Sequence, residues 1–182
     1  LLLYIKNLKK VNVCKISKNK SFKMNQNLKS KMLSFLKKLI AIALLTFIIT
    51  FLEIYWSMQS LSEQISSGNP DSHFFDDAYL ISVFTTVFLT IIFMFLAFIK
   101  KIYLRIAAQL LIIISTWFFW NYSIFVDRES SWSTYLFKEE IMHTLTLSFF
   151  PILVLSIVMV FVLNYISKNR SLKHEKINTP NI

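Results

Sequence analysis

The 182-residue chain has very little glycine, proline and cysteine, and these shortages exclude several kinds of functional site. Its single glycine, Gly68, cannot supply a glycine-rich phosphate loop, a nucleophile elbow or a Gly-x-x-x-Gly helix contact. Its single cysteine, Cys14, excludes an internal disulfide and any Cys-x-x-Cys redox or zinc motif. Any chemistry of this chain therefore has to depend on other residue types.

Charged residues are almost absent from four long apolar runs, residues 39–56, 78–99, 106–126 and 141–167, and Glu53 is the only formally charged residue inside them. A helix rises about 1.5 Å per residue, so about 20 apolar residues cross the roughly 30 Å hydrocarbon core of a bilayer. The sequence therefore predicts an all-α membrane protein with four transmembrane helices. We expect these helices at about residues 39–57, 78–99, 103–126 and 141–167.

Basic and acidic residues separate into alternating segments, which predicts how the chain lies in the membrane. Residues 1–38, the turn between the second and third helices, and residues 168–182 together hold 18 basic residues and one acid. The other segments hold nine acids and only two basic residues, Arg128 and Lys138. Because Lys and Arg in short loops stay in the cytoplasm, we expect both termini to be cytoplasmic. The short connections favour an antiparallel up-down-up-down bundle in the bacterial inner membrane.

The segments outside the four helices are too short to form a second packed core, so we expect three regions. Residues 1–38 would be a basic cytoplasmic arm, residues 39–167 the transmembrane domain, and residues 168–182 a basic cytoplasmic tail. The first methionine is Met24, so residues 1–23 could be an untranslated stretch before the true start. The first run could also belong to a cleaved signal peptide, although it is longer than such a segment needs.

Small and hydroxyl residues recur along one face of each predicted helix, and such residues mark helix contacts in a bilayer. We expect these stripes to face the interior of the bundle. They are Thr46, Thr50, Glu53 and Ser57; Ser82, Thr86 and Thr90; Gln109 with Thr116 beside Ala107 with Ser115; and Thr144, Ser148 and Pro151.

Four residues on or beside these stripes are candidates for a polar site inside the membrane: Glu53, Thr50, Gln109 and Thr116. An acid that faces lipid costs about 2–3 kcal/mol, so Glu53 is the most informative of them. Its carboxyl group could bind a proton or a cation within the bundle. The alternative is a structural group near the headgroups, bonded to a neighbouring hydroxyl or to Trp56.

A second group of candidates lies at the outer mouth of the bundle: Asp76, Asp77, Glu140 and His143. Glu140 and His143 are three residues apart, which places them on one face of a helix. With His73 and Asp77 they could form a divalent-metal site. The alternative is that the acids simply favour helix N-termini, where they suit the helix dipole. We therefore expect no cofactor.

The motifs favour no particular reaction, so three function classes stay open. The first is a non-enzymatic accessory or binding protein, for example an immunity-type protector against a membrane-active toxin. The second is a transporter or channel component that uses Glu53. Small four-helix proton-coupled exporters also carry a first-helix Glu, but they depend on helix glycines that this chain does not have. The third is a membrane enzyme with an outer metal site. Expected partners are the lipid bilayer and a membrane protein or a second copy, and not nucleic acid.

Overall fold

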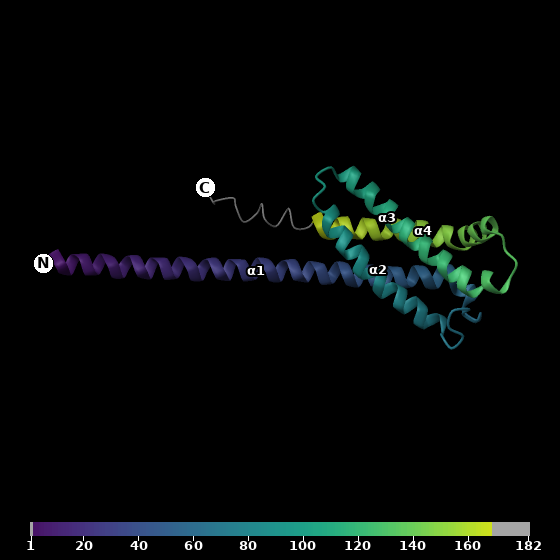
Figure 1. Cartoon of the computed structure of the whole chain (residues 1–182). Helices are drawn as coiled ribbons and strands as arrows, with labels where there is room; N and C mark the ends of the chain where they lie inside the picture. The colour runs from purple at the N-terminus through teal and green to yellow at the C-terminus, as the bar shows by residue number, and fades with distance from the viewer. Residues whose placement is uncertain (1, 169–182) are drawn as a thin grey trace. The chain divides into compact units, whose positions relative to one another are not determined.

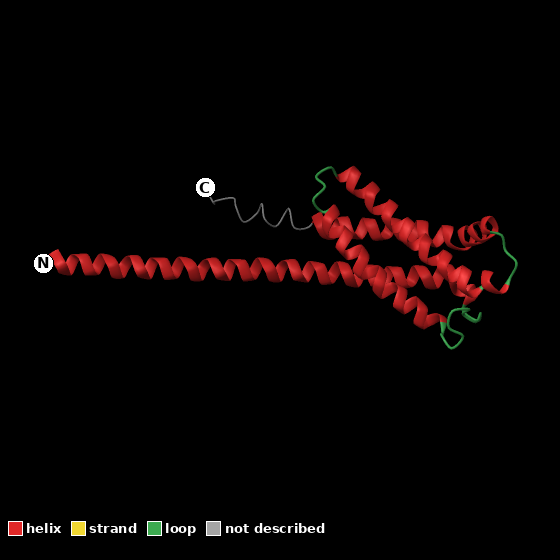
Figure 2. Ribbon diagram, in the orientation of Figure 1, coloured by secondary structure: helices red, strands yellow, loops and turns green. Residues whose placement is uncertain are grey.

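A computed structural model of the chain describes the backbone of residues 2–168 and the side chains of residues 29, 30 and 32–166. Within residues 2–168 the chain is helical throughout its regular structure, and no strand occurs there (Figure 2). The predicted tail, residues 168–182, lies outside this range apart from Lys168. The side chains of most of the predicted basic arm also lie outside the described residues.

Four long helices and two short 3₁₀ turns make up the described chain (Figure 1). They are α1 (Leu2–Met58), η1 (Gln59–Leu61), α2 (Phe74–Leu96), α3 (Ile102–Arg128), η2 (Ser130–Trp132) and α4 (Phe137–Lys168). Four segments are long and apolar enough to span a membrane: Met32–Leu61, Phe74–Leu96, Ile102–Trp132 and Phe137–Ile166. For the described residues, these segments confirm the prediction of an all-helical chain with four helices long and apolar enough to cross a membrane.

The helices begin earlier than the apolar runs alone predict. Helix α1 begins at Leu2 rather than near residue 39, since residues 2–38 contain neither proline nor glycine to interrupt it. Helices α2 and α4 each begin four residues before the predicted start. Their first turns carry acids, which the positive end of the helix dipole stabilises, so a polar first turn precedes each apolar run.

The chain divides into two compact units, Leu1–Ala41 and Ile42–Ile182. The second unit contains the last part of α1 together with α2, α3 and α4. Two apolar clusters form its core. One contains Ile49, Leu89, Phe93, Ile113, Trp117, Ile152, Met159, Val160 and Leu163; the other contains Ile54, Met58, Leu61, Phe74, Ala78, Ile81, Ile124 and Phe125.

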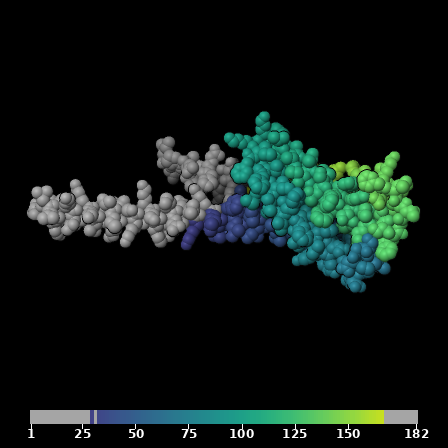
Figure 3. Space-filling view, in the orientation of Figure 1, coloured from purple at the N-terminus to yellow at the C-terminus, as the bar shows by residue number. Residues whose placement is uncertain are grey.

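Aromatic side chains join the helices of the second unit. Phe51 of α1 meets Phe75 of α2 edge to face, with ring centroids 5.4 Å apart. Trp56 of α1 meets Phe150 of α4 in the same way at 5.8 Å. Helix α3 packs against both α2 and α4, and the space-filling view shows α2 and α3 side by side (Figure 3). Edge-to-face pairs at these distances add to the packing that holds helices together in lipid.

The polar stripes of α1, α2 and α4 face the interior as predicted. Thr46, Thr50 and Glu53 are each 0% exposed. Ser57, Ser82, Thr90, Thr144, Ser148 and Pro151 are buried as well, and Thr86 is half-buried. On α3 the prediction is half right: Gln109 is buried, whereas Ala107 and Ser115 are exposed. Apolar packing around Ile113 and Trp117 sets the rotation of α3 and turns the Ala107 ridge outward.

Candidate functional site

The buried carboxyl group of Glu53 is held by donors from two helices. Ser57, one turn further along α1, donates its hydroxyl to Oε1 of Glu53 at 2.7 Å. Asn121 of α3 donates Nδ2 to the same oxygen at 2.8 Å. Both Glu53 and Asn121 are 0% exposed. The contact therefore joins α1 to α3 through a polar bond inside an apolar interior, where water cannot replace either partner.

A second polar bond runs parallel to this one, one turn toward the middle of the bundle. Trp117 of α3 donates its indole N–H to Oγ1 of Thr50 at 3.1 Å. In the described part of the chain, Oε2 of Glu53 and Oδ1 of Asn121 are buried without a hydrogen-bond partner. Two acceptor atoms at this site are therefore available to a proton, a water molecule or a small cation.

At the acid-rich end of the bundle, Arg128 is the central residue. Its side chain is only 2% exposed and forms an ion pair with Asp77 of α2, with Nη2 and Oδ2 2.5 Å apart. It also donates to the backbone carbonyl of Gln64 at 2.5 Å and to that of Ser72 at 3.4 Å. Its guanidinium lies 5.5 Å from the centre of the Phe74 ring. One cation thereby joins the end of α3, the start of α2 and the loop between α1 and α2.

Asp127, the neighbour of Arg128, also holds the loop between α1 and α2, at residues 67 and 68. Its Oδ1 accepts the hydroxyl of Ser67 at 2.9 Å and the backbone N–H of Gly68 at 3.0 Å. Trp132 in η2 donates its indole N–H to the carbonyl of Ile65 at 2.9 Å. The loop of residues 59–73 is therefore fixed along its length. We call the two loops at this end, residues 59–73 and 129–136, the acidic cap.

Glu140 and His143 lie at the start of α4, under the second loop of the acidic cap. Glu140 accepts hydrogen bonds from the hydroxyls of Ser130 and, at 2.8 Å, Tyr122. His143 stacks on the Phe125 ring with centroids 6.1 Å apart, and the Tyr135 ring lies 5.1 Å away. These contacts attach α4 to the end of α3.

The structure gives the residues of the predicted metal site other partners and does not gather them. Asp77 pairs with Arg128, and Glu140 bonds with hydroxyls. Asp76 and His73 are exposed. Among the described residues, no group of three or more His, Cys, Asp or Glu side chains could hold a metal ion. Asp76, Asp77 and Glu140 lie in the first turns of α2 and α4, and Asp77 and Glu140 also accept hydrogen bonds.

The intramembrane candidates also fall into separate places. Thr50 and Glu53 lie together beside α3. Gln109 lies toward the other end of α3, where its Oε1 accepts Nδ2 of Asn164 at 3.0 Å. Thr116 donates its hydroxyl to the Ile112 carbonyl of its own helix at 2.7 Å. Only Thr50 and Glu53 therefore contribute to one shared polar site.

Sequence reasoning missed three residues that complete these sites: Trp117, Asn121 and Arg128. All three lie on the buried face of α3 together with Gln109 and Ile113. Spacings of four, four, four and seven residues connect these five positions, which is the period of one helix face. Including aromatic, amide and charged residues in the search for stripes would have found this face.

Comparison with known protein families, curated proteins and solved structures gives no match. The class of protein therefore follows from the helices themselves: four segments of the described chain have the length and hydropathy of membrane spans. They indicate a membrane protein, with polar contacts both between its helices and at the ends of the bundle.

Proposed function

We propose that this chain is a non-enzymatic protein of the bacterial inner membrane that binds another membrane component through its acidic cap, as an accessory or immunity-type protein does. The observation that carries this proposal is the fixation of the cap by the buried Arg128. Preorganised surfaces lose less conformational freedom on binding, so a fixed loop favours recognition.

Charge and exposure support a basic partner for the acidic cap. Glu63, Asp71 and Asp76 are exposed on or directly beside the first loop, where no basic residue neutralises them along residues 59–76. Ile65 is 59% exposed and Trp132 is 63% exposed, so apolar side chains lie among these acids. Interfaces commonly combine an apolar or aromatic anchor with a charged rim. A cationic segment of a membrane protein or of a membrane-active peptide fits this surface.

In this proposal the helices run up-down-up-down with both termini in the cytoplasm and the acidic cap on the outer side. The separation of basic from acidic segments supports this orientation. Contacts between α3 and α4 support the helix order: Arg105 near the start of α3 bonds Asn164 near the end of α4, and Tyr122 bonds Glu140 at their opposite ends.

Site-specific photo-crosslinking tests the binding function. A photoreactive phenylalanine analogue replaces Trp132 in the acidic cap, and a matched control replaces Phe88, which is 52% exposed on α2. We expect one dominant adduct from position 132 in intact cells and only lipid adducts from position 88. The combined change Glu63→Gln, Asp71→Asn and Asp76→Asn should reduce the adduct severalfold. An adduct insensitive to these changes, or none at all, contradicts the proposal.

A second candidate function, ion-coupled transport, is favoured by the two unpartnered acceptor atoms of Glu53 and Asn121 described above. A carboxyl group with a free acceptor oxygen in the membrane is a common element of proton pathways. The test is Glu53→Gln, which keeps the size and one acceptor oxygen. In proteoliposomes, a proton-coupled flux that disappears in this variant supports transport. An equal flux in both proteins, or no flux in either, leaves Glu53 as a structural contact between α1 and α3.

A further inference from the structure

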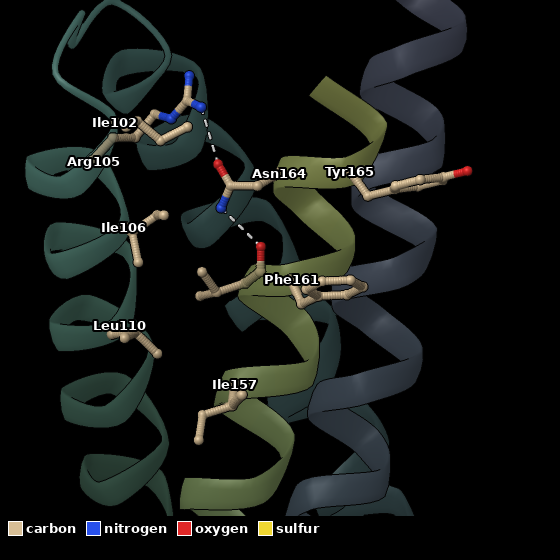
Figure 4. A pocket seen from close by; sticks show the side chains of 9 residues that line it. Ile102, Arg105, Ile106, Leu110, Ile157, Phe161, Asn164 and Tyr165 are labelled. Carbon is tan, nitrogen blue, oxygen red and sulfur yellow. Dashed lines mark hydrogen bonds between the residues drawn. The ribbon is translucent and has the colours of Figure 1, made fainter. Parts of the chain in front are cut away.

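A groove between α3 and α4 opens at the end of the bundle opposite the acidic cap (Figure 4). Its volume is about 720 Å³, which falls within the roughly 300–1,000 Å³ typical of small-molecule sites. The walls are almost entirely apolar. Ile106 and Leu110 line it from α3, and Ile157 and Phe161 line it from α4. Such a surface accepts a hydrocarbon chain.

One cationic group lies at the head of this groove. Nη2 of Arg105 donates to Oδ1 of Asn164 at 3.0 Å, across the space between the two helices (Figure 4). Asn164 in turn donates to the Val160 carbonyl at 2.8 Å and to Oε1 of Gln109 at 3.0 Å. This chain of bonds fixes the guanidinium at the groove's end.

No acid among the described residues pairs with the charge of Arg105. Its Nε is buried and has no hydrogen-bond acceptor in that part of the chain. A cation against an apolar wall is costly unless an anion accompanies it. The groove is therefore built for a ligand with an anionic head and an apolar tail.

We propose that this groove binds one anionic phospholipid, with its phosphate on Arg105 and an acyl chain along Ile106, Leu110 and Ile157. The exposed Lys100 and Lys101, in the loop just before α3, do not line the groove and contribute only to the diffuse positive charge of this end. Basic pockets between membrane helices are known to select anionic lipid headgroups, and a fixed guanidinium binds phosphate through two parallel hydrogen bonds.

The exposure of the groove walls identifies the occupant as a bilayer lipid. Phe161 is 73% exposed and Ile157 is 54% exposed, so the groove opens on the side where lipid chains surround a membrane helix. Tyr165 is 60% exposed at the headgroup end, a position that Tyr favours in membrane proteins. The inference concerns the leaflet at the basic end and does not depend on the role of the acidic cap.

Native mass spectrometry of the purified full chain tests this proposal. The protein in detergent is titrated with phosphatidylglycerol and, separately, with phosphatidylcholine. We expect one phosphatidylglycerol to be retained in preference to phosphatidylcholine. In Arg105→Gln this preference should fall by about tenfold or more, because the charge-assisted bonds to phosphate are lost. The matched control Lys101→Gln removes the same charge from the exposed loop and should change it by less than about threefold.

A second pair of variants tests the acyl-chain part without touching the cation. Ile157→Trp fills the groove and should reduce retention of the lipid severalfold, whereas Val158→Trp, an exposed neighbour outside the groove, should not. Equal effects of Arg105→Gln and Lys101→Gln would mean that only a diffuse surface charge attracts the lipid. Displacement of the lipid by inorganic phosphate alone, or unchanged retention in Ile157→Trp, would also overturn the proposal.

Discussion

At the scale of single residues, the bond between Asn121 and Glu53 matters because it joins two helices across an apolar interior. Asn121→Ala removes the donor from α3 and leaves Glu53 with Ser57 alone. We expect the free energy of unfolding to fall by about 1 kcal/mol, within the range measured for hydrogen bonds between membrane helices. In a double-mutant cycle with Glu53→Ala, the coupling energy should be about 0.6 kcal/mol, as measured by reversible unfolding in mixed micelles containing SDS.

The control for this cycle is Thr116→Ala. The Thr116 hydroxyl bonds only a carbonyl of its own helix among the contacts described, so it should show no coupling to Glu53. Coupling of Asn121 to Glu53 that is no larger than the coupling of Thr116 to Glu53 would contradict the proposed contact.

Arg128 provides the second test at this scale, because its removal takes one of two donors from Asp77 and removes a donor from two carbonyl groups. Arg128→Met keeps much of the apolar stem. Loss of one partner from a fully buried pair lowers the free energy of unfolding by about 3–5 kcal/mol. We expect a loss of about 2 kcal/mol here because Asp77 is 31% exposed. Amide hydrogen exchange in the loop of residues 59–73 should become much faster. The exposed Lys138→Met is the control, and equal exchange in both variants would exclude a fixing role for Arg128.

At the scale of elements, α1 presents two different faces over residues 46–57. Thr50 and Glu53 are fully buried, whereas Ile48 is 47% exposed and Leu52 is 51% exposed. Single cysteines at these four positions, in a Cys14→Ser background, should react accordingly with a lipid-soluble maleimide. We expect positions 48 and 52 to react at least severalfold faster than positions 50 and 53. Equal rates along the helix would mean that α1 does not pack on α3 as the structure describes.

The sequence predicts each helix better than it predicts how helices meet. Thr50 and Glu53 are buried as their spacing indicates, because a polar stripe is itself the cause of burial in lipid. That Asn121 meets Glu53 depends on the rotation of α3, which the apolar residues of three other helices determine. Gln109 likewise meets Asn164 only because α4 has a particular register along α3. The spacing of residues within one helix does not predict which residues of two helices meet.

The ends of the helices are also harder to predict from the sequence than their existence. The apolar runs correctly give four helices long and apolar enough to cross a membrane, but α2 and α4 extend beyond them through first turns that contain acids. Apolarity measures contact with lipid, whereas helix formation also depends on the dipole and on the absence of proline and glycine. Hydropathy alone therefore underestimates the length of these helices.

At the scale of the whole molecule, the charges are arranged so that each end of the second unit has its own chemistry. The acidic cap is fixed from within by one cation, Arg128, which pairs with Asp77 and donates to backbone carbonyls. The opposite end has Arg105, whose charge no described acid neutralises. One end therefore offers negative charge to its surroundings and the other offers positive charge, an asymmetry that agrees with the proposed orientation in a membrane.

The orientation of this asymmetry can be measured directly. A cysteine replaces Asp71 in the acidic cap or Lys100 in the basic loop, both exposed, again with Cys14→Ser. If the basic segments are cytoplasmic, a membrane-impermeant maleimide should label position 71 in intact cells and position 100 only after the cells are opened. Labelling of position 100 but not of position 71 in intact cells would reverse the orientation and place the lipid groove in the outer leaflet. Labelling of both positions would mean that the two loops share one side, which a four-crossing bundle cannot satisfy.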